Sequence, residues 1–235
     1  MSNYGDLYVM WREPKSNRRH VIGQLGRDSE GFSFAYSRTG VEEAAPRGFY
    51  PLPEFPGIDQ AYTARHLFST FAQRVPSPRR PDFKQLIESW LVSNPDDPLE
   101  ILANSGGLLA TDQLELAAVR PNDDRLDEPL ICRLAGAGHY ADEFGKLQIG
   151  DSLQLARDIR NENDPSAVRV LRQDAQVGWV PKQYSKLIAR LLDEGVQLDV
   201  RIKGSVRAPE LHERMLLRIS RLSGGLPQST PGLRV

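Results

Sequence analysis

The sequence has few of the residues that build disulfides and metal sites. Its 235 residues include one cysteine, Cys132, and four histidines that lie far apart along the chain. One cysteine cannot close an intrachain disulfide or form a cysteine-based zinc cluster, and the histidines lack the spacing of metal ligands. We therefore expect no metal and no cofactor. A reducing cytoplasm is the default compartment for such a chain.

Long hydrophobic runs are also absent. No apolar stretch approaches the roughly 18 residues that a membrane-spanning helix needs. The opening residues, MSNYGDLYVMW, lack the basic segment and apolar run of a signal peptide. Both observations predict a cytoplasmic protein.

Catalytic motifs are equally scarce. No Lys-Ser/Thr pair follows Gly106-Gly107, as a Walker A loop requires, and no G-x-G-x-x-G surrounds these glycines. No Ser-His-Asp order stands out, and we interpret the paired acids Asp123-Asp124 as part of a solvated linker. We therefore expect that the chain is not an enzyme and that a partner would do any chemistry.

What is present is the composition of a globular protein. Hydrophobic residues make up 40% and charged residues 26% of the chain, and the net charge is −1. The charge is unevenly distributed: residues 1–127 carry a net −4 and residues 128–235 a net +3. This asymmetry hints that the second half meets anions.

Proline and acidic residues concentrate in one stretch near the middle of the chain, Val119 to Pro129 (VRPNDDRLDEP). It is the best linker in the sequence. We predict one domain at 1–118, a linker at 119–129, a second domain at 130–222 and a mobile tail at 223–235.

The first domain is predicted to be a small antiparallel sheet with helices. Its strands are expected at 7–11, 21–25, 31–36 and 114–116, and its helices at 62–74, 82–91 and 99–104. The prolines of segment 49–57 exclude a helix there and indicate an extended segment packed onto the domain.

The second domain alternates short strands with one helix. Strands are expected at 130–136, 152–157, 167–170, 177–180, 196–202 and 213–222, with a helix at 184–194. About six short strands around one helix are typical of an OB-like β-barrel. The fold class is therefore α+β with two domains.

The stretch from Arg157 to Lys182 is the centre of this second domain. Its segment Asn161-Glu162-Asn163-Asp164-Pro165 concentrates residues that hydrogen-bond local backbone, and we expect the strands that follow it to pair. A rigid polar loop between strands can present side chains to a ligand. A plain hairpin with a well-made turn is the alternative.

Residues 130–204 resemble a HIRAN domain, the module found in fork-remodelling SNF2 helicases and alone in bacteria. Several elements in one order carry the resemblance. They are Gly136-x-x-His139-Tyr140, Gly150-Asp151-x-Leu153-x-Leu155, Arg157-x-x-x-Asn161-x-x-Asp164-x-x-Ala167-Val168-x-Val170 and Val177-Gly178-Trp179-Val180-Pro181-Lys182. The resemblance implies an OB-like barrel and, as in one member of the family, a grip on the 3′ end of single-stranded DNA.

The resemblance also implies which residues bind. Asp164 would accept a hydrogen bond from a terminal hydroxyl, while aromatic rings would stack on bases and basic side chains would meet phosphates. The nucleic-acid-binding residues implied in this way are His139, Tyr140, Arg157, Arg160, Asn161, Asn163, Asp164, Trp179 and Lys182. Their alternative roles are structural, with Asp164 capping the loop and Trp179 in the core.

Two departures from the family pattern affect the end pocket. This chain has Asn163 where the DNA-binding member has an aromatic residue, and Gly138-His139 where that member has an Arg-aromatic pair. The loop therefore supports binding of a single strand more firmly than recognition of a 3′ hydroxyl.

Residues 7–116 more loosely resemble the small N-terminal subdomain of HipA-type toxin kinases. The residues that carry this resemblance include Val21-Ile22-Gly23-Gln24-Leu25 and Pro51-Leu52-Pro53-x-Phe55-Pro56, followed by Leu67-Phe68-x-x-Phe71 and Leu102-Ala103-x-x-Gly106-Gly107. The kinase core is missing, because no catalytic-loop or metal-binding kinase motif follows.

Taken together, these features predict a non-catalytic nucleic-acid-binding protein. Its barrel would bind single-stranded DNA, with the 3′ end as the candidate target, and its first domain would be an adaptor for a DNA-processing enzyme. The alternative is an antitoxin-like regulator whose partner is a HipA-family kinase.

Overall fold

The computed structural model describes residues 5–119, 125–205 and 215–222. The chain divides into two compact units. The N-terminal unit comprises residues 1–121 and 204–209, and the C-terminal unit comprises residues 122–203 and 210–235. The predicted linker and tail fall wholly or partly outside the described residues, so the predicted domain boundaries stay predictions.

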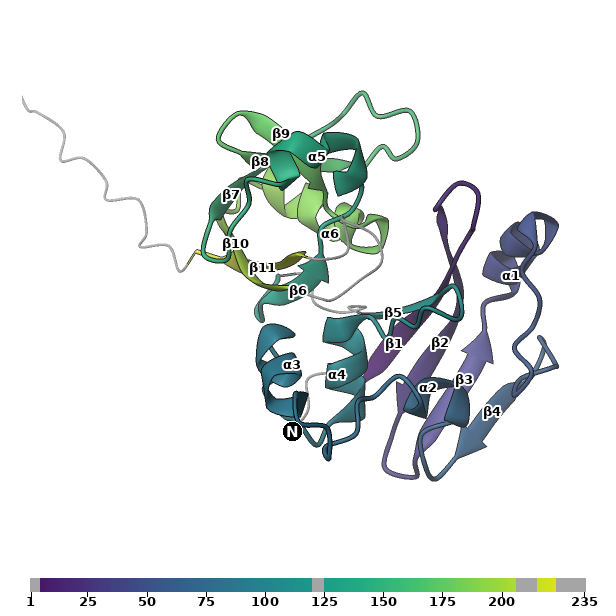
Figure 1. The fold of residues 1–235 in the computed structure, drawn as a ribbon. Helices are drawn as coiled ribbons and strands as arrows, with labels where there is room; N and C mark the ends of the chain where they lie inside the picture. Colours follow the sequence, from purple (N-terminus) through teal and green to yellow (C-terminus); the bar gives the residue numbers. More distant parts are fainter. Residues whose placement is uncertain (1–4, 120–124, 206–214, 223–235) are drawn as a thin grey trace, which may run out of the picture. The chain divides into compact units, whose positions relative to one another are not determined.

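The N-terminal unit is built on a five-stranded antiparallel sheet with the order β4-β3-β2-β1-β5 (Figure 1). The register is continuous except at a bulge between Val9 and Met10. Its strands are β1 (Asp6–Arg12), β2 (Arg19–Arg27), β3 (Phe32–Tyr36), β4 (Ala61–Ala64) and β5 (Leu114–Ala118).

Short helices lie between these strands. Pro98 starts α4, where the Asp97 carboxylate accepts from Leu99 N, and Gly106 ends it in the left-handed conformation that glycine favours. The helices are α1 (Arg38–Ala44), the 3-10 turn η1 (Ala45–Arg47), α2 (Ser69–Ala72), α3 (Phe83–Ser89) and α4 (Pro98–Ser105).

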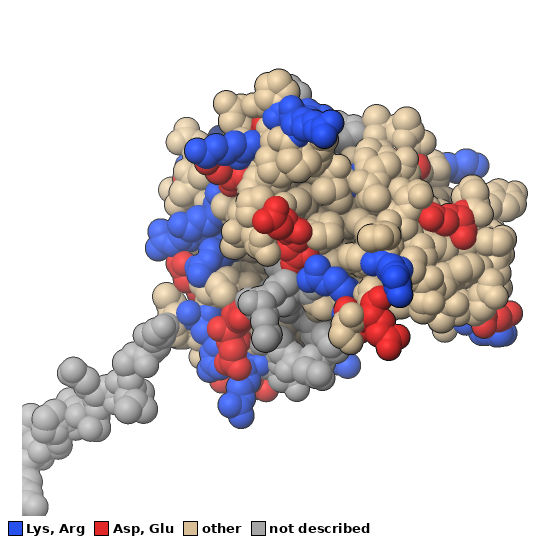
Figure 2. All heavy atoms as spheres, turned by 90° about the horizontal axis from the view of Figure 1, so that it is seen from below, with Lys and Arg blue, Asp and Glu red and all other residues tan. Residues whose placement is uncertain are grey.

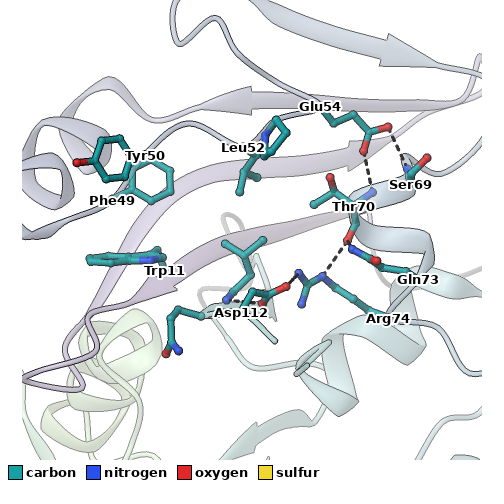
Figure 3. A pocket seen from close by; sticks show the side chains of 13 residues that line it. Trp11, Phe49, Tyr50, Leu52, Glu54, Ser69, Thr70, Gln73, Arg74 and Asp112 are labelled. Atoms are coloured by element: carbon teal, nitrogen blue, oxygen red, sulfur yellow. Dashed lines mark hydrogen bonds and ion pairs between the residues drawn. The ribbon is translucent and has the colours of Figure 1, made fainter. Parts of the chain in front are cut away.

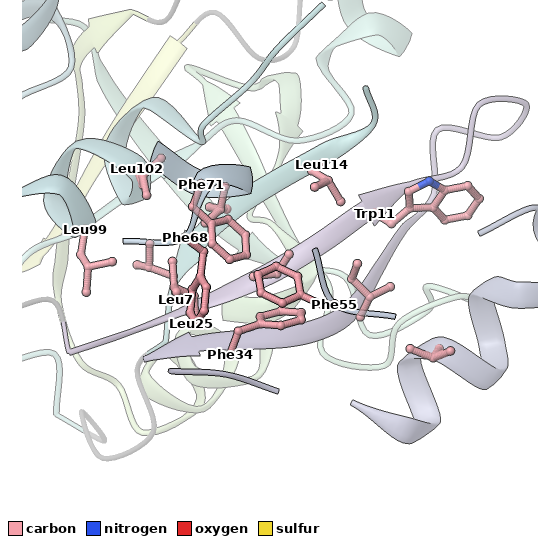
Figure 4. Close-up of a cluster of buried hydrophobic side chains, with 14 of the residues drawn as sticks. Leu7, Trp11, Leu25, Phe34, Phe55, Phe68, Phe71, Leu99, Leu102 and Leu114 are labelled. Atoms are coloured by element: carbon pink, nitrogen blue, oxygen red, sulfur yellow. The ribbon is translucent and has the colours of Figure 1, made fainter. Parts of the chain in front are cut away.

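Aromatic side chains fill the core of this unit (Figure 4). Phe34, Phe55 and Phe71 are fully buried, and the Phe34 and Phe55 ring centres lie 4.4 Å apart. Tyr36 fixes the proline-rich segment by donating to Phe55 O and accepting from Leu52 N. Burial raises the pKa of Tyr36, so its hydroxyl keeps the proton that it donates. The segment at 49–57 therefore packs onto the sheet as predicted.

One prediction for this unit is wrong, and one helix was missed. The helix expected at 62–74 is instead strand β4 followed by the short α2. Tyr62 pairs with Phe34 across β3 and β4, and its hydroxyl donates to Gly57 O and accepts from Gly57 N. These tertiary contacts outweigh the helical spacing of the apolar residues. Helix α1 was not predicted, although Ser37 caps it by accepting from Gly40 N.

The C-terminal unit is a six-stranded sheet that curls into a half-barrel, with the order β6-β11-β10-β7-β8-β9. Helix α6 (Lys182–Asp193) follows β9, and two short turns, η2 (Ala137–Tyr140) and α5 (Ala141–Phe144), follow β6. The strands are β6 (Leu130–Arg133), β7 (Ser152–Arg157), β8 (Val168–Arg172), β9 (Ala175–Trp179), β10 (Leu198–Ser205) and β11 (Met215–Arg221). The α+β class and the two predicted architectures are confirmed.

A single bridge joins the two ends of this curled sheet. Ala135, two residues beyond edge strand β6, pairs with Trp179 at the end of the opposite edge strand, β9. Ala135 N donates to Trp179 O at 3.0 Å, and Trp179 N donates to Ala135 O at 2.8 Å. Pairing the free edges in this way satisfies backbone groups that an open sheet would leave exposed.

Two glycines make this bridge possible. A Cβ atom at Gly178 would lie 2.6 Å from Ala135 O, and one at Gly136 would lie 2.8 Å from Trp179 Cδ1. Gly136 also has a φ of +67°, a left-handed backbone conformation that is strained for a residue with a side chain. The edges meet closely because neither position carries a side chain.

We therefore expect Gly178→Ala to destabilise the protein. The added methyl group must push Ala135 away, and overpacking of this kind costs about 1–3 kcal/mol. Urea titration should show the lower free energy of unfolding. The control is Gly5→Ala, where a Cβ meets nothing within 4 Å. Equal stability of both variants and the unchanged protein would contradict this account of the bridge.

Candidate nucleic-acid interface

The loop between β7 and β8 is held in shape by its own side chains. Asn161 Oδ1 accepts from the backbone N–H groups of Asn163 and Asp164, each at 3.0 Å. Asn161 Nδ2 donates to Asp158 Oδ2 at 3.2 Å. Asparagine and aspartate commonly stabilise turns by bonding to nearby backbone in this manner. The loop is thus well defined before any ligand arrives.

Asp164 ties this loop to helix α6. Its Oδ1 accepts from Ser166 N at 2.9 Å, and its Oδ2 accepts from the hydroxyl of Ser185 at 2.7 Å. Ser185 is buried on α6, one turn after Lys182. Both carboxylate oxygens therefore hold structure together, and the loop lies beside the start of α6.

Arg157 clamps the same loop from its other end. Its Nε donates to Asp193 Oδ1 at 3.0 Å, and its Nη1 donates to Ala167 O at 3.2 Å. The guanidinium also lies within hydrogen-bonding distance of Pro165 O. The structure thus gives Arg157 a positioning role in the loop.

Trp179 and Arg169 lie side by side on one face of the sheet. They are directly opposite each other on β9 and β8, and directly opposite side chains of an antiparallel pair share a face. Ala135 continues the row beyond Trp179, and Ala156 continues it beyond Arg169. The neighbouring Val168 of β8 is fully buried on the other face. Small residues thus flank an indole and a guanidinium, both of them half-buried.

One nitrogen of Arg169 has no partner. Its Nε is buried away from solvent, yet it donates to no acceptor among the described residues. Buried donors in folded proteins are nearly always paired, so an unpaired guanidinium nitrogen needs an explanation.

The turn η2 brings the remaining predicted aromatics to this region. Both η2 and α5 pack against β9, the strand that carries Trp179. His139 is exposed and Tyr140 is half-buried. The structure therefore places the turn that carries His139 and Tyr140 against the strand that carries Trp179.

Comparison with known protein families matches this part of the chain. The model of the HIRAN domain family matches residues 131–220. Residues 131–220 form a HIRAN domain. No curated protein sequence matches the chain.

Two solved structures are similar to this chain. One is the HIRAN domain of human HLTF, with 21% identity over 40% of this chain and 74% of that one and a TM-score of 0.34. The other is a protein from Lactobacillus plantarum, with 19% identity over 40% of this chain and 97% of that one and a TM-score of 0.31. The comparisons do not support the predicted resemblance of residues 7–116 to HipA-type kinases.

The HIRAN domain has a few exposed cations without an ion pair rather than a broad basic patch. Lys182 and Arg160 are exposed, and neither makes an ion pair with a described residue. By contrast, Arg201 is paired with Asp199. On the face drawn in Figure 2, basic and acidic side chains lie interspersed. A few unpaired cations near the loop and Trp179 would therefore attract an anion more than the surface as a whole.

The described residues contain neither a candidate metal cluster nor a candidate membrane-spanning helix. No three of their His, Cys, Asp and Glu side chains cluster closely enough to hold a metal ion. None of their helices combines the length and apolar character needed to cross a bilayer.

Sequence reasoning missed Arg169 and Ser185. Arg169 is the polar residue between Val168 and Val170 in an alternating strand, and this pattern predicts that its side chain lies on the outer face. Its cross-strand position opposite Trp179 depends on a register shift between Val170 and Leu171, which no sequence pattern reveals. Ser185 carries no sequence signal for its bond to Asp164, because the two residues meet only in the folded domain.

The Asp164–Ser185 contact makes a measurable prediction. A double-mutant cycle with Asp164→Asn and Ser185→Ala should give a coupling energy of about 1–2 kcal/mol in unfolding experiments, since one partner is a carboxylate. Asn163→Ala is the matched loop control and should change stability by less than about 0.5 kcal/mol, because its side chain is exposed. Strictly additive effects of the two substitutions would show that the hydrogen bond does not anchor the loop.

Proposed function

We propose that this protein is a non-catalytic nucleic-acid-binding protein whose HIRAN domain holds single-stranded DNA. The observation that carries the proposal is the pairing of Trp179 with Arg169 on one half-buried face, with the Arg169 Nε unpaired. A ring for stacking beside a guanidinium is the combination that single-strand binders use. The family resemblance supports the same reading.

Each group has a distinct part in this proposal. The indole of Trp179 stacks on a base, a contact worth roughly 1–3 kcal/mol whatever the base. Arg169 and Lys182 meet phosphate oxygens, and guanidinium groups suit phosphates because their donors form a planar fork. His139 and Arg160 are exposed and would extend the contact along the strand.

Asp164 and Arg157 have a supporting part. Both oxygens of Asp164 already accept hydrogen bonds, and Arg157 is already engaged by Asp193 and backbone carbonyls. Holding the loop beside α6 keeps Lys182 close to it. A carboxylate can accept further bonds, so a terminal hydroxyl can still reach Asp164.

The N-terminal unit is the adaptor in this proposal, and a partner enzyme does any chemistry on the bound strand. The division follows from the placement of the candidate interface, because all of its residues belong to the C-terminal unit.

Fluorescence anisotropy with short labelled single strands tests the DNA-binding proposal. We expect salt-dependent binding that weakens roughly tenfold in Trp179→Ala, the loss of one stacked base. Arg169→Gln and Lys182→Gln should each reduce the slope of log K against log salt by about 0.7, the value for one phosphate contact on a single strand. No binding by the unchanged protein at low salt would refute the proposal.

The matched control for these variants is Arg201→Gln. Arg201 is an exposed cation of the same domain whose charge is already paired with Asp199. Its removal changes net charge as the other two variants do, so general electrostatics alone would affect all three equally. An equal loss in Arg201→Gln would show that binding is not centred on Trp179.

Recognition of the 3′ end is a separate prediction. Because Asn163 and Gly138 replace residues of the end-gripping pattern, we expect strands with a free 3′ hydroxyl and with a 3′ phosphate to bind within about threefold of each other, a difference under 1 kcal/mol. Competition titrations with the two strands measure this ratio. A preference of tenfold or more for the hydroxyl, lost in Asp164→Asn, would instead establish an end pocket.

A further inference from the structure

The N-terminal unit contains a groove with a volume of about 700 Å³ that the DNA-binding proposal does not use (Figure 3). Volumes of roughly 300–1,000 Å³ are typical of ligand-binding pockets. We call it the aromatic groove. It is lined by Trp11, Phe49, Tyr50, Leu52, Pro53, Glu54, Ser69, Thr70, Gln73, Arg74, Asp112, Gln113 and Leu114.

One part of the groove is apolar. Trp11 at the end of β1 and Phe49 are buried and meet edge to face, with ring centres 5.8 Å apart. Tyr50, next to Phe49, is 81% exposed. A large aromatic side chain left in solvent beside a buried aromatic wall is typical of an interaction site.

The other part of the groove is polar, but its one cation is not available. Arg74 donates from Nε to Thr70 O at 2.9 Å and from Nη1 to Gly107 O at 2.7 Å, and its Nη2 binds Asp112. The side chain of Arg74 is 1% exposed. An anionic ligand such as a phosphate therefore finds no free cation here.

Glu54 leaves the groove with an unbalanced negative charge. Its two oxygens accept from Ser69 N and Thr70 N, and it makes no ion pair with a described residue. Burial opposes its ionisation, but the hydrogen bonds from Thr70 and Ser69 prevail and lower its pKa. Glu54 is thus charged at neutral pH, while the charges of Arg74 and Asp112 cancel.

We propose that the aromatic groove binds an extended peptide segment of a partner protein, with an apolar residue or proline next to a lysine or arginine. The apolar residue packs on Trp11 and Tyr50, and the basic residue meets Glu54. An extended segment fits because the groove runs between the chain at 49–54 and the chain at 112–114 (Figure 3). This inference rests on the proposed adaptor role and names the surface that would bind the partner. The groove would bind a basic peptide, whereas the HIRAN domain would bind a nucleic acid.

Selection of random short peptides displayed on phage, against the immobilised full chain, tests the proposal. We expect a consensus in which a basic residue neighbours leucine or proline. A synthetic fluorescent peptide of that consensus should bind about tenfold more weakly to Tyr50→Ala, as for a typical aromatic hot spot. It should bind about threefold more weakly to Glu54→Gln, with a flatter salt dependence.

Matched controls distinguish the groove from other surfaces. Ile149→Ala removes an exposed apolar side chain of the C-terminal unit, and Glu30→Gln removes an exposed carboxylate elsewhere on the N-terminal unit. Neither should change peptide binding. The proposal is overturned if no consensus emerges, if the consensus is acidic, or if Tyr50→Ala binds the peptide as tightly as the unchanged protein.

The same variants separate this inference from the DNA-binding proposal. Tyr50→Ala and Glu54→Gln should keep the affinity for single-stranded DNA of the unchanged protein, since neither residue belongs to the HIRAN domain. If the unchanged protein does not bind DNA, the DNA-binding proposal alone is refuted. If no peptide consensus emerges, the peptide-binding proposal for the aromatic groove alone is refuted.

Discussion

The paired hydrogen bonds between Ala135 and Trp179 are the contact on which the C-terminal unit depends. They join a segment just beyond one edge strand to the end of the other, so the two edges of the curled sheet satisfy each other's backbone groups at this point. The contact needs close approach of two backbones, which Gly136 and Gly178 allow by lacking side chains. It also fixes the backbone of Trp179, because its N–H and its C=O are both bonded to Ala135. A residue of the candidate interface is therefore held by the same bonds that close the fold.

The loop and helix α6 extend this rigidity to the charged groups. Asp164 bonds to Ser185 on α6, and Arg157 bonds to Asp193 near the end of the same helix. The loop is thus attached to both ends of α6, and Lys182 at its start has a defined position relative to Trp179. Charged side chains that serve as anchors are satisfied within the protein, whereas Lys182 and Arg160 are exposed and make no ion pair with a described residue. Whether a charged side chain is already bonded within the protein therefore distinguishes supporting residues from candidate contacts better than its residue type does.

Sequence patterns predicted the C-terminal unit better than the N-terminal one, and the reason lies in the kind of signal. The strands around Val168 and Val177 alternate clearly, and the pairing between them is local, so periodicity alone identified the hairpin. Helical spacing at 62–74 was misleading, because the partners of Tyr62 are Phe34 and Gly57, which spacing cannot reveal. Arg169 escaped notice for the same reason: its meaning comes from Trp179 across the sheet. Residues whose role depends on local turns, such as Asn161, were identifiable from the sequence.

The two units differ in which charges they leave unbalanced, and this difference bears on how they would work together. The candidate DNA-binding residues include two exposed cations without an ion pair among the described residues, Lys182 and Arg160, while in the aromatic groove the only unpaired charge among the described lining residues is that of Glu54. By these charges a single strand would be repelled by the groove, and a basic peptide would be repelled by Lys182 and Arg160. Each proposed ligand would therefore be directed to its own unit, even though the net charge of the whole chain is only −1. Local pairing of charges, rather than net charge, is what would allow one small protein to hold a nucleic acid and a protein partner without competition between them.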